Sequence, residues 1–181
     1  MGLYGSLGNG AAMRVSSAGF LATSVDEAIS LSDRVTEVTH NHPEGIRGAA
    51  ATAVAIHRAR TGSSTQEIRA EISNRFGYDL SMSVDEIRPV YGYNETCQDT
   101  VPQSLTCALE ASGFEDAIRN AISIGGDSDT IAAIAGGLAE ALFGIPEPIA
   151  EKAWSFLPQD MKVVLHALYR RVGTRPEGAP R

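Results

Sequence analysis

The sequence predicts an all-α protein in which many helices form one domain. Apolar residues recur at spacings of three and four along most of the chain, which is the period of an amphipathic helix. Ser, Asp and Pro precede these stretches and Gly follows them, as at helix ends. No segment alternates apolar and polar residues as a strand would. The chain has 181 residues, of which 43% are hydrophobic, so it is large enough to bury a single core.

The first part of the chain predicts three helices. A short one opens at Asn9 or Gly10 and reaches Phe20. The run Ser24-Val25-Asp26-Glu27 has the capping-box pattern and starts a second helix. Its expected core-facing residues are Ala28, Ile29, Leu31, Val35 and Val38. This helix ends before Pro43, because the residue preceding a proline disfavours helical dihedral angles. Pro43 then suits the first turn of a helix that ends near Gly62.

The middle of the chain predicts shorter helices. Ser63 or Ser64 caps one that ends at Gly77, and Ser83 caps a short piece that Pro89 interrupts. Residues 90–100 are expected to be irregular, because they are rich in Tyr, Asn and Asp. Helices are expected over residues 103–111 and 114–124.

The last part predicts a helix over residues 128–143 that is rich in small residues and contains the Gly136-Gly137 pair. Glycine pairs weaken an exposed helix, so we place this helix at the centre of the bundle. Two helices follow, over residues 148–157 and 158–172, and the second is expected to turn Met161, Val164, Leu165 and Leu168 inward. The domain therefore covers residues 1–172, and residues 173–181 are expected to be a disordered tail.

The formal net charge of −7 argues against sequence-independent binding of nucleic acid or of an anionic membrane surface. No apolar run is long enough to span a bilayer, and no signal-peptide core is found at the start. Cys97 and Cys107 lack metal-type spacing. These features together favour a cytoplasmic protein with two incidental thiols.

The segment that carries the most chemistry is Gly125-Gly126-Asp127-Ser128-Asp129-Thr130, at the start of the helix with small residues. Two carboxylates and a hydroxyl within one turn are the hard oxygen ligands that Mg²⁺ prefers. The alternative is ordinary capping, because acids and hydroxyls are favoured at helix starts. One acid would suffice for a cap, so two acids and Thr130 after a double glycine favour a metal site.

Two other segments are polar and lie at expected helix starts. Residues 8–14, Gly8-Asn9-Gly10-Ala11-Ala12-Met13-Arg14, form a small-residue loop whose backbone N–H groups suit a phosphate. Taken alone, the pattern favours a turn and a helix cap. Residues 39–44 contain His40 and His42. These imidazoles would bind a transition metal, face a substrate, or cap the preceding helix, and the residues alone favour capping.

Three segments, taken in order, resemble the ADP-ribosylglycohydrolases: residues 8–14, residues 39–45 and residues 125–132. The resemblance covers nearly the whole chain apart from its tail. It implies an orthogonal multi-helix bundle with a dinuclear Mg²⁺ site, sometimes Mn²⁺, in a cleft. It implies that Asp127, Asp129 and Thr130 are metal ligands. It also implies that Asn9, Gly10 and Met13 line the ADP-ribose cleft, with His40 or His42 facing the ligand, Tyr91 or Tyr93 near the adenosine, and backbone amides at Asn9 and Gly10 near the diphosphate.

The same resemblance implies the activity, which is metal-dependent hydrolysis of the N- or O-glycosidic bond that joins ADP-ribose to a protein side chain or a small molecule. This sequence begins almost at the Gly-Asn-Gly segment, whereas family members carry earlier metal-binding motifs. We therefore expect an N-terminally truncated fragment, a member whose missing segment is supplied by a second chain or copy, or a protein that binds without catalysing. A non-catalytic ADP-ribose-binding module and a purely structural helical protein are the alternatives, and no general base is assigned.

Overall fold

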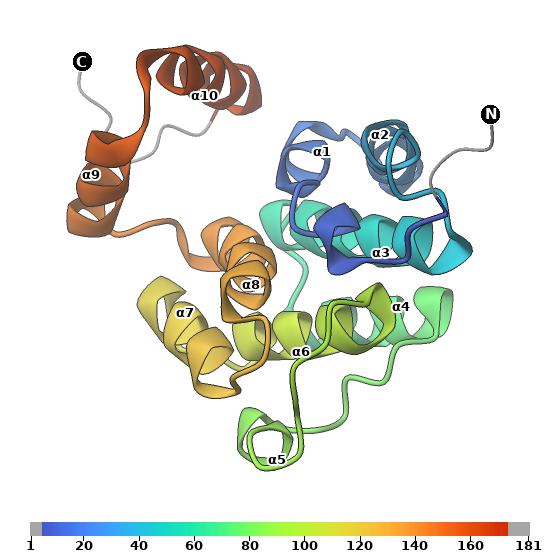
Figure 1. Cartoon of the computed structure of the whole chain (residues 1–181). Helices are drawn as coiled ribbons and strands as arrows, with labels where there is room; N and C mark the ends of the chain where they lie inside the picture. Colours follow the sequence, from blue (N-terminus) through green and yellow to red (C-terminus); the bar gives the residue numbers. More distant parts are fainter. Residues whose placement is uncertain (1–4, 174–181) are drawn as a thin grey trace.

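The computed structural model describes residues 5–173, which fold as ten α-helices and one short 3₁₀ helix (Figure 1). No strand occurs in these residues, where only the isolated bridges Gly5–His40 and Gly8–Thr96 pair extended backbone. The all-α prediction is confirmed. The tail expected over residues 173–181 lies outside the described range from residue 174 onward.

The elements follow one another with short connections. In chain order they are η1 (Asn9–Ala11), α1 (Ser16–Leu21), α2 (Val25–Thr36), α3 (Pro43–Arg60), α4 (Thr65–Phe76), α5 (Val84–Ile87), α6 (Cys97–Leu109), α7 (Phe114–Ser123), α8 (Ser128–Phe143), α9 (Glu147–Phe156) and α10 (Gln159–Val172).

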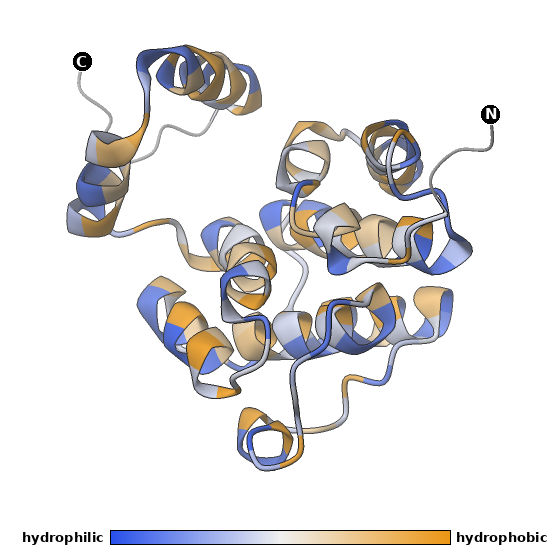
Figure 2. Cartoon of the chain, in the orientation of Figure 1, coloured by the Kyte–Doolittle hydropathy of each residue, from blue (hydrophilic) through white to orange (hydrophobic). Residues whose placement is uncertain are grey.

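Helix α3 packs against more of the other helices than any other element of the described chain. It packs against α1, α2, α4, α6 and α8, and its residues 48–57 are all buried. The sequence placed α8 at the centre instead. Helix α8 does pack on α3, α6 and α7, but its Gly136 and Gly137 are only partly buried. Figure 2 shows the apolar colours concentrated where these helices face one another.

Close helix packing depends on residues without side chains. A Cβ on Gly19 of α1 would lie 2.6 Å from the Ala53 carbonyl oxygen and 2.7 Å from Ile56 Cβ, both in α3. A Cβ on Gly48 of α3 would lie 2.7 Å from Cys97 Cβ at the start of α6. Both distances are shorter than Cβ contacts allow, so α1 and α6 approach α3 only because glycine stands at these positions.

Several helix ends agree with the sequence. The hydroxyls of Ser24, Ser64 and Ser83 each accept a hydrogen bond from the backbone N–H of N3, and Ser64 and Ser83 form complete capping boxes. Gly77 ends α4 in the left-handed conformation.

Cys97 and Cys107 are free and buried. None of the helices in residues 5–173 combines the length and apolar character that a bilayer crossing requires.

Helix α6 begins six residues earlier than the sequence predicted, at Cys97 instead of residue 103. Pro102 lies inside it and removes one backbone donor, which normally breaks or kinks a helix. Here the first turns bury Cys97, Thr100 and Val101 completely. Tertiary burial therefore outweighs the local preference of proline, and the irregular segment ends at Thr96.

Two expected core faces are confirmed only in part. On α2, Ala28 is buried and Ile29 and Leu31 pack against the core, but Val35 is 38% exposed and Val38, beyond the helix end, is 62% exposed. Ser32 and Thr36 are buried instead. On α10, Leu165 and Leu168 are partly buried, whereas Met161 and Val164 are 54% and 67% exposed rather than inward. Helix α10 touches α1, and its Tyr169 hydroxyl donates to Glu140 Oε1 of α8 at 2.7 Å. Neither α9 nor α10 contains a buried residue.

The packing of α1 on α3 predicts the effect of adding one methyl group. Gly19→Ala should lower the free energy of unfolding by about 1–3 kcal/mol, because the new Cβ overpacks the interface. Helix propensity alone would raise the free energy of unfolding, because alanine favours a helix more than glycine does. Gly92→Ala is the control, since nothing lies within 4 Å of its Cβ position and Gly92 caps no helix. Urea denaturation measures both, and a Gly19→Ala protein as stable as the parent would contradict the close approach.

Candidate functional site

The turn before α8 has a backbone that favours glycine at two successive positions. Gly125 and Gly126 have φ angles of +75° and +72°, in the left-handed region that other residues avoid. A Cβ on Gly126 would also lie 2.6 Å from Tyr91 Cε1. Tyr91 therefore packs directly on this turn. The double glycine lets the chain reverse beneath an aromatic ring and then deliver Asp127 to the start of α8.

Asp127 occupies the N-cap position of α8 but does not cap it. Its side chain makes no hydrogen bond to the helix, and its Oδ2 instead accepts from Asn9 Nδ2 at 2.7 Å. The same amide nitrogen donates to Thr100 Oγ1 at 3.2 Å. Asn9 is only 6% exposed. One buried amide thus joins η1, α6 and α8, and the capping alternative does not hold for Asp127.

Asp129 and Thr130 complete an oxygen cluster at the same helix end. The adjacent Asp127 side chain, together with the backbone N–H groups of Thr130 and of Asp129 itself, holds the pKa of Asp129 below its usual value. Within residues 5–173, neither acid takes part in an ion pair. Thr130 is 7% exposed, and its hydroxyl donates weakly to Met13 Sδ at 3.6 Å. Asp127 and Asp129 are therefore neighbours without a cationic partner, and Thr130 follows them in the first turn of α8.

The loop of residues 8–13 is fastened to the start of α6. The Asn9 backbone N–H donates to the Glu95 carbonyl at 2.7 Å, and Cys97 Sγ donates to the Gly8 carbonyl at 3.3 Å. The expectation that the Asn9 N–H faces a diphosphate is therefore wrong, because that group already has a partner. Met13 remains 44% exposed beside Thr130.

The two histidines have different surroundings. The His40 ring lies against the loop, with Nε2 3.1 Å from the Cβ position of Gly10 and Nδ1 2.7 Å from Thr39 Oγ1. Burial and the nearby Arg14 lower the pKa of His40, so the ring is neutral at pH 7. His42 Nδ1 accepts from the Glu44 N–H at 3.2 Å and caps α3. It caps the helix that follows, not the preceding one as expected.

The structure therefore places the His40 ring against the loop that contains Asn9, Gly10 and Met13. Within this loop, Asn9 contacts Asp127 and Met13 contacts Thr130. His42 lies at the start of α3 and is occupied as a cap. Tyr91 is packed under the turn, and Tyr93 is 69% exposed with its hydroxyl bonded to Glu95. The sequence reasoning missed Thr100, which accepts from Asn9, because it lies in a stretch expected to be irregular.

The oxygen cluster fits a hard divalent cation in its chemistry. Carboxylate and hydroxyl oxygens suit Mg²⁺, which is typically held by one or two protein carboxylates and keeps several waters. Two neighbouring acids without a cationic partner also fit, because an ion would relieve their repulsion. The described residues contain no group of three His, Cys, Asp or Glu side chains that could hold a metal, so the cluster supplies only part of a coordination shell.

Comparison with known proteins decides the family. The model of the ADP-ribosylglycohydrolase family matches residues 2–177. This chain belongs to the ADP-ribosylglycohydrolase family. All the segments on which the sequence resemblance rested lie within the matched range.

Individual relatives in this family differ in how much they share with the chain. An uncharacterised protein of Archaeoglobus fulgidus is 31% identical over 90% of the chain and 59% of its own length. The ADP-ribosylarginine hydrolase Tri1 of Pseudomonas putida is 33% identical over 66% of the chain and 35% of its own length. Human ADP-ribosylhydrolase ARH3 is 26% identical over 79% of the chain and 52% of its own length.

A solved structure supports the fold. An ADP-ribosylglycohydrolase-related protein complex superposes with a TM-score of 0.70 at 24% identity, covering 92% of this chain and 61% of that chain. The chain thus spans roughly half the length of the curated relatives it matches. These comparisons establish the family and the helical fold.

The Asn9 amide predicts a pH-dependent effect. Asn9→Asp would place a third carboxylate beside Asp127, lowering stability at pH 7 by about 1–3 kcal/mol. Repulsion raises the pKa of this group in the folded state above its unfolded value. The free energy of unfolding of the variant should therefore approach that of the parent below about pH 4, and should fall below it as the pH rises. Thermal unfolding at both pH values tests this, with exposed Gln66→Glu as control. A pH-independent loss would contradict the contact.

Proposed function

We propose that this protein is a metal-dependent hydrolase that removes ADP-ribose from a modified protein side chain or a small molecule, by cleaving an N- or O-glycosidic bond. The observation that carries the proposal is the oxygen cluster of Asp127, Asp129 and Thr130, in which Asp127 is bonded to the buried Asn9 amide instead of capping its helix. Similarity to proteins named ADP-ribosylarginine hydrolase and ADP-ribosylhydrolase supports the choice of bond.

In this proposal Asp127, Asp129 and Thr130 hold Mg²⁺ or Mn²⁺. When bound, such an ion supplies Lewis-acid character and orients hydroxyl groups and water at the bond that breaks. The remaining ligands would be water, substrate oxygens or groups outside the cluster. None of the described residues is assigned as a general base, because none combines a suitable carboxylate or imidazole with a demonstrated place beside the scissile bond.

The chain's own residues have defined tasks around the ligand. The Asn9 amide fixes the rotamer of Asp127 through its 2.7 Å hydrogen bond, so this carboxylate is oriented before an ion arrives. His40 is neutral at pH 7, because burial lowers its pKa, and its ring can exchange hydrogen bonds with ribose or phosphate oxygens. Gly10 leaves room beside that ring. The exposed Met13 offers an apolar contact to the substrate.

A second candidate is a non-catalytic module that binds ADP-ribose. The observation that favours it is the incomplete coordination shell, since no described group of three acidic or imidazole side chains surrounds the cluster. Under this alternative, ADP-ribose would bind in calorimetry with Mg²⁺ present, but no bond would break. A purely structural role would give neither binding nor turnover.

Isosteric removal of each charge tests the proposed hydrolase. Asp127→Asn and Asp129→Asn should each reduce Mg²⁺-dependent release of ADP-ribose from a modified arginine or serine peptide by about 100-fold or more, because a ligand charge is lost. EDTA should abolish the parent's activity, and added Mg²⁺ should restore it. Asp26→Asn, which removes an exposed acid from the first turn of α2, should leave the rate unchanged.

Two outcomes would contradict this assignment. Turnover that is indifferent to EDTA would exclude the metal. Variants as active as the parent would show that the two acids have another purpose. Binding of ADP-ribose without any release from peptides would replace the hydrolase with the binding module.

We further propose that a second copy of this chain covers the exposed face of α10. The apolar side chains of Met161 and Val164 on this face are each more than half exposed. An apolar groove of about 330 Å³ is lined by Asp160, Met161, Val164 and Leu165. The helix has an acid in its first turn and Arg170 and Arg171 in its last. In an antiparallel pair, each Asp160 would therefore face the arginines of the other copy, which favours a two-fold dimer.

Sedimentation analysis tests this interface. The parent should form a concentration-dependent dimer, and Val164→Glu should shift it to monomer by placing a charge in the apolar face. Val38→Glu is the control, because Val38 is 62% exposed in the turn after α2, away from α10. A parent protein that stays monomeric at every concentration would contradict the proposed homodimer, and another polypeptide would then have to cover the exposed face of α10.

A further inference from the structure

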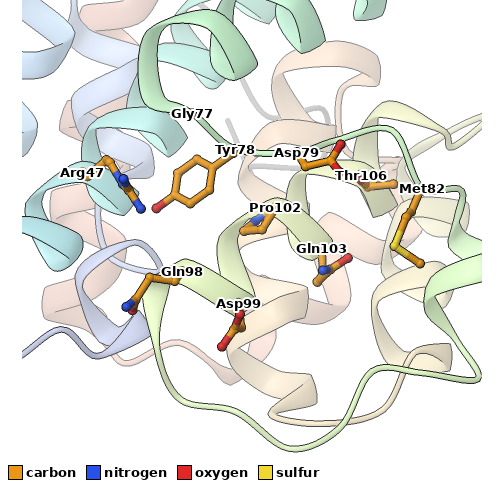
Figure 3. Close-up of a pocket in the computed structure, with 10 residues that line it drawn as sticks. All are labelled: Arg47, Gly77, Tyr78, Asp79, Met82, Gln98, Asp99, Pro102, Gln103 and Thr106. Carbon is orange, nitrogen blue, oxygen red and sulfur yellow. The ribbon is translucent and has the colours of Figure 1, made fainter.

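A second pocket lies between the start of α3, the segment after α4 and one face of α6. It has a volume of about 300 Å³. Figure 3 shows the residues that line it, with Arg47, Tyr78 and Gln98 at one end and Met82 at the other. The α6 residues Asp99, Pro102, Gln103 and Thr106 share one helix face. Thr100, which bonds Asn9, is not among the lining residues, so this pocket is separate from the oxygen cluster.

The end of the pocket at Arg47 contains polar atoms without partners. Tyr78 is only 5% exposed, and the Arg47 guanidinium lies over its ring, with Cζ 5.1 Å from the ring centroid. The Tyr78 hydroxyl nevertheless makes no hydrogen bond of good geometry. In Figure 3 this hydroxyl points toward the Arg47 side chain. Arg47 Nε and Gln98 Oε1 are likewise buried without partners. Leaving such groups unpaired costs about 1–3 kcal/mol each, so three together in one pocket indicate that a polar group belongs among them.

The hydrogen-bonding capacity of these atoms specifies the missing group. Arg47 Nε can only donate, Tyr78 can donate its hydroxyl proton, and Gln98 Oε1 can only accept. Burial raises the pKa of Tyr78 to about 12, so its proton is present at neutral pH. A complementary group needs an acceptor with two lone pairs next to a donor. A carboxamide has both, on adjacent atoms.

The charges around the pocket select against an anion. Arg47 is already paired with Glu44, and two further lining residues, Asp79 and Asp99, are exposed acids. The local balance is therefore negative. A carboxylate has the same shape as a carboxamide but would lack the donor for Gln98 and would be repelled by both acids. The remaining lining from Met82, Pro102 and the Tyr78 ring suits a small apolar body.

We propose that this pocket is a binding site for a carboxamide group, whose oxygen accepts from Tyr78 and Arg47 and whose NH₂ group donates to Gln98. The side chains of Arg47 and Gln98 are only partly buried, so they can turn toward an entering ligand while Tyr78 stays fixed. The group belongs either to a free small molecule or to a glutamine side chain of a bound protein. The proposal does not depend on ADP-ribose hydrolysis.

Paired isosteric probes test the site. Benzamide and benzoate are titrated into the full chain by calorimetry, and by amide NMR that follows the side-chain NH₂ signals of Gln98 and Gln103. Benzamide should bind saturably below about 10 mM, a range that reveals even millimolar affinity, and should shift both signals. Benzoate should bind at least about tenfold more weakly, because one hydrogen bond is lost and two repulsions are gained. A tripeptide containing glutamine, against its glutamate counterpart, distinguishes the two sources.

Tyr78→Phe is the decisive variant, because it removes the unpaired hydroxyl and keeps the ring. Its stability should not fall, since no hydrogen bond is lost, while benzamide affinity should fall about three- to tenfold. Tyr169→Phe is the matched control, because that hydroxyl has a partner in Glu140. It should lose stability and keep benzamide binding.

Three results would overturn the proposal. Benzoate that binds as tightly as benzamide would show that the pocket does not select a carboxamide over a carboxylate. If neither the probes nor the peptides bind saturably, the pocket is not a binding site for this group. A Tyr78→Phe protein with unchanged benzamide affinity would show that the hydroxyl does not contact the ligand. Failure of ADP-ribose hydrolysis in the same preparation would bear only on the oxygen cluster.

Discussion

The arrangement of the candidate site depends on one buried amide. Asn9 donates to Asp127 at 2.7 Å and to Thr100 at 3.2 Å, which ties the first loop of the chain to a helix start more than a hundred residues later. A side-chain amide suits this place, because it donates to a carboxylate without adding a charge. Its contact also draws Asp127 away from the free N–H groups of α8, so the acid remains available to a ligand.

The bundle allows that contact only because its helices approach closely. Gly19 and Gly48 leave α1 and α6 almost in backbone contact with α3. This places η1, which precedes α1, against the first turn of α6. The double glycine before α8 then turns the chain beneath Tyr91. Small residues and left-handed turns, rather than large apolar side chains, therefore set the positions of the three segments that form the site.

Features encoded within a few residues were predictable from sequence. The serine caps, the glycine stop after α4 and the proline start of α3 all lie where the local chemistry placed them, as does the extent of α8. Features decided by distant partners were not. Pro102 is accommodated inside α6 because the first turn is buried, and α2 buries Ser32 and Thr36 instead of Val35. The Asn9–Asp127 pairing links residues too far apart for any local pattern to reveal.

In the proposed hydrolase, Asp127, Asp129 and Thr130 together hold a divalent ion. Crystals soaked with Mn²⁺, which replaces Mg²⁺ and gives an anomalous signal, show whether they do. We expect an anomalous peak bonded to oxygens of both carboxylates and the threonine hydroxyl, and its loss in Asp127→Asn crystals. A soaked crystal with Mn²⁺ bound elsewhere, or no peak between the two acids, would contradict it.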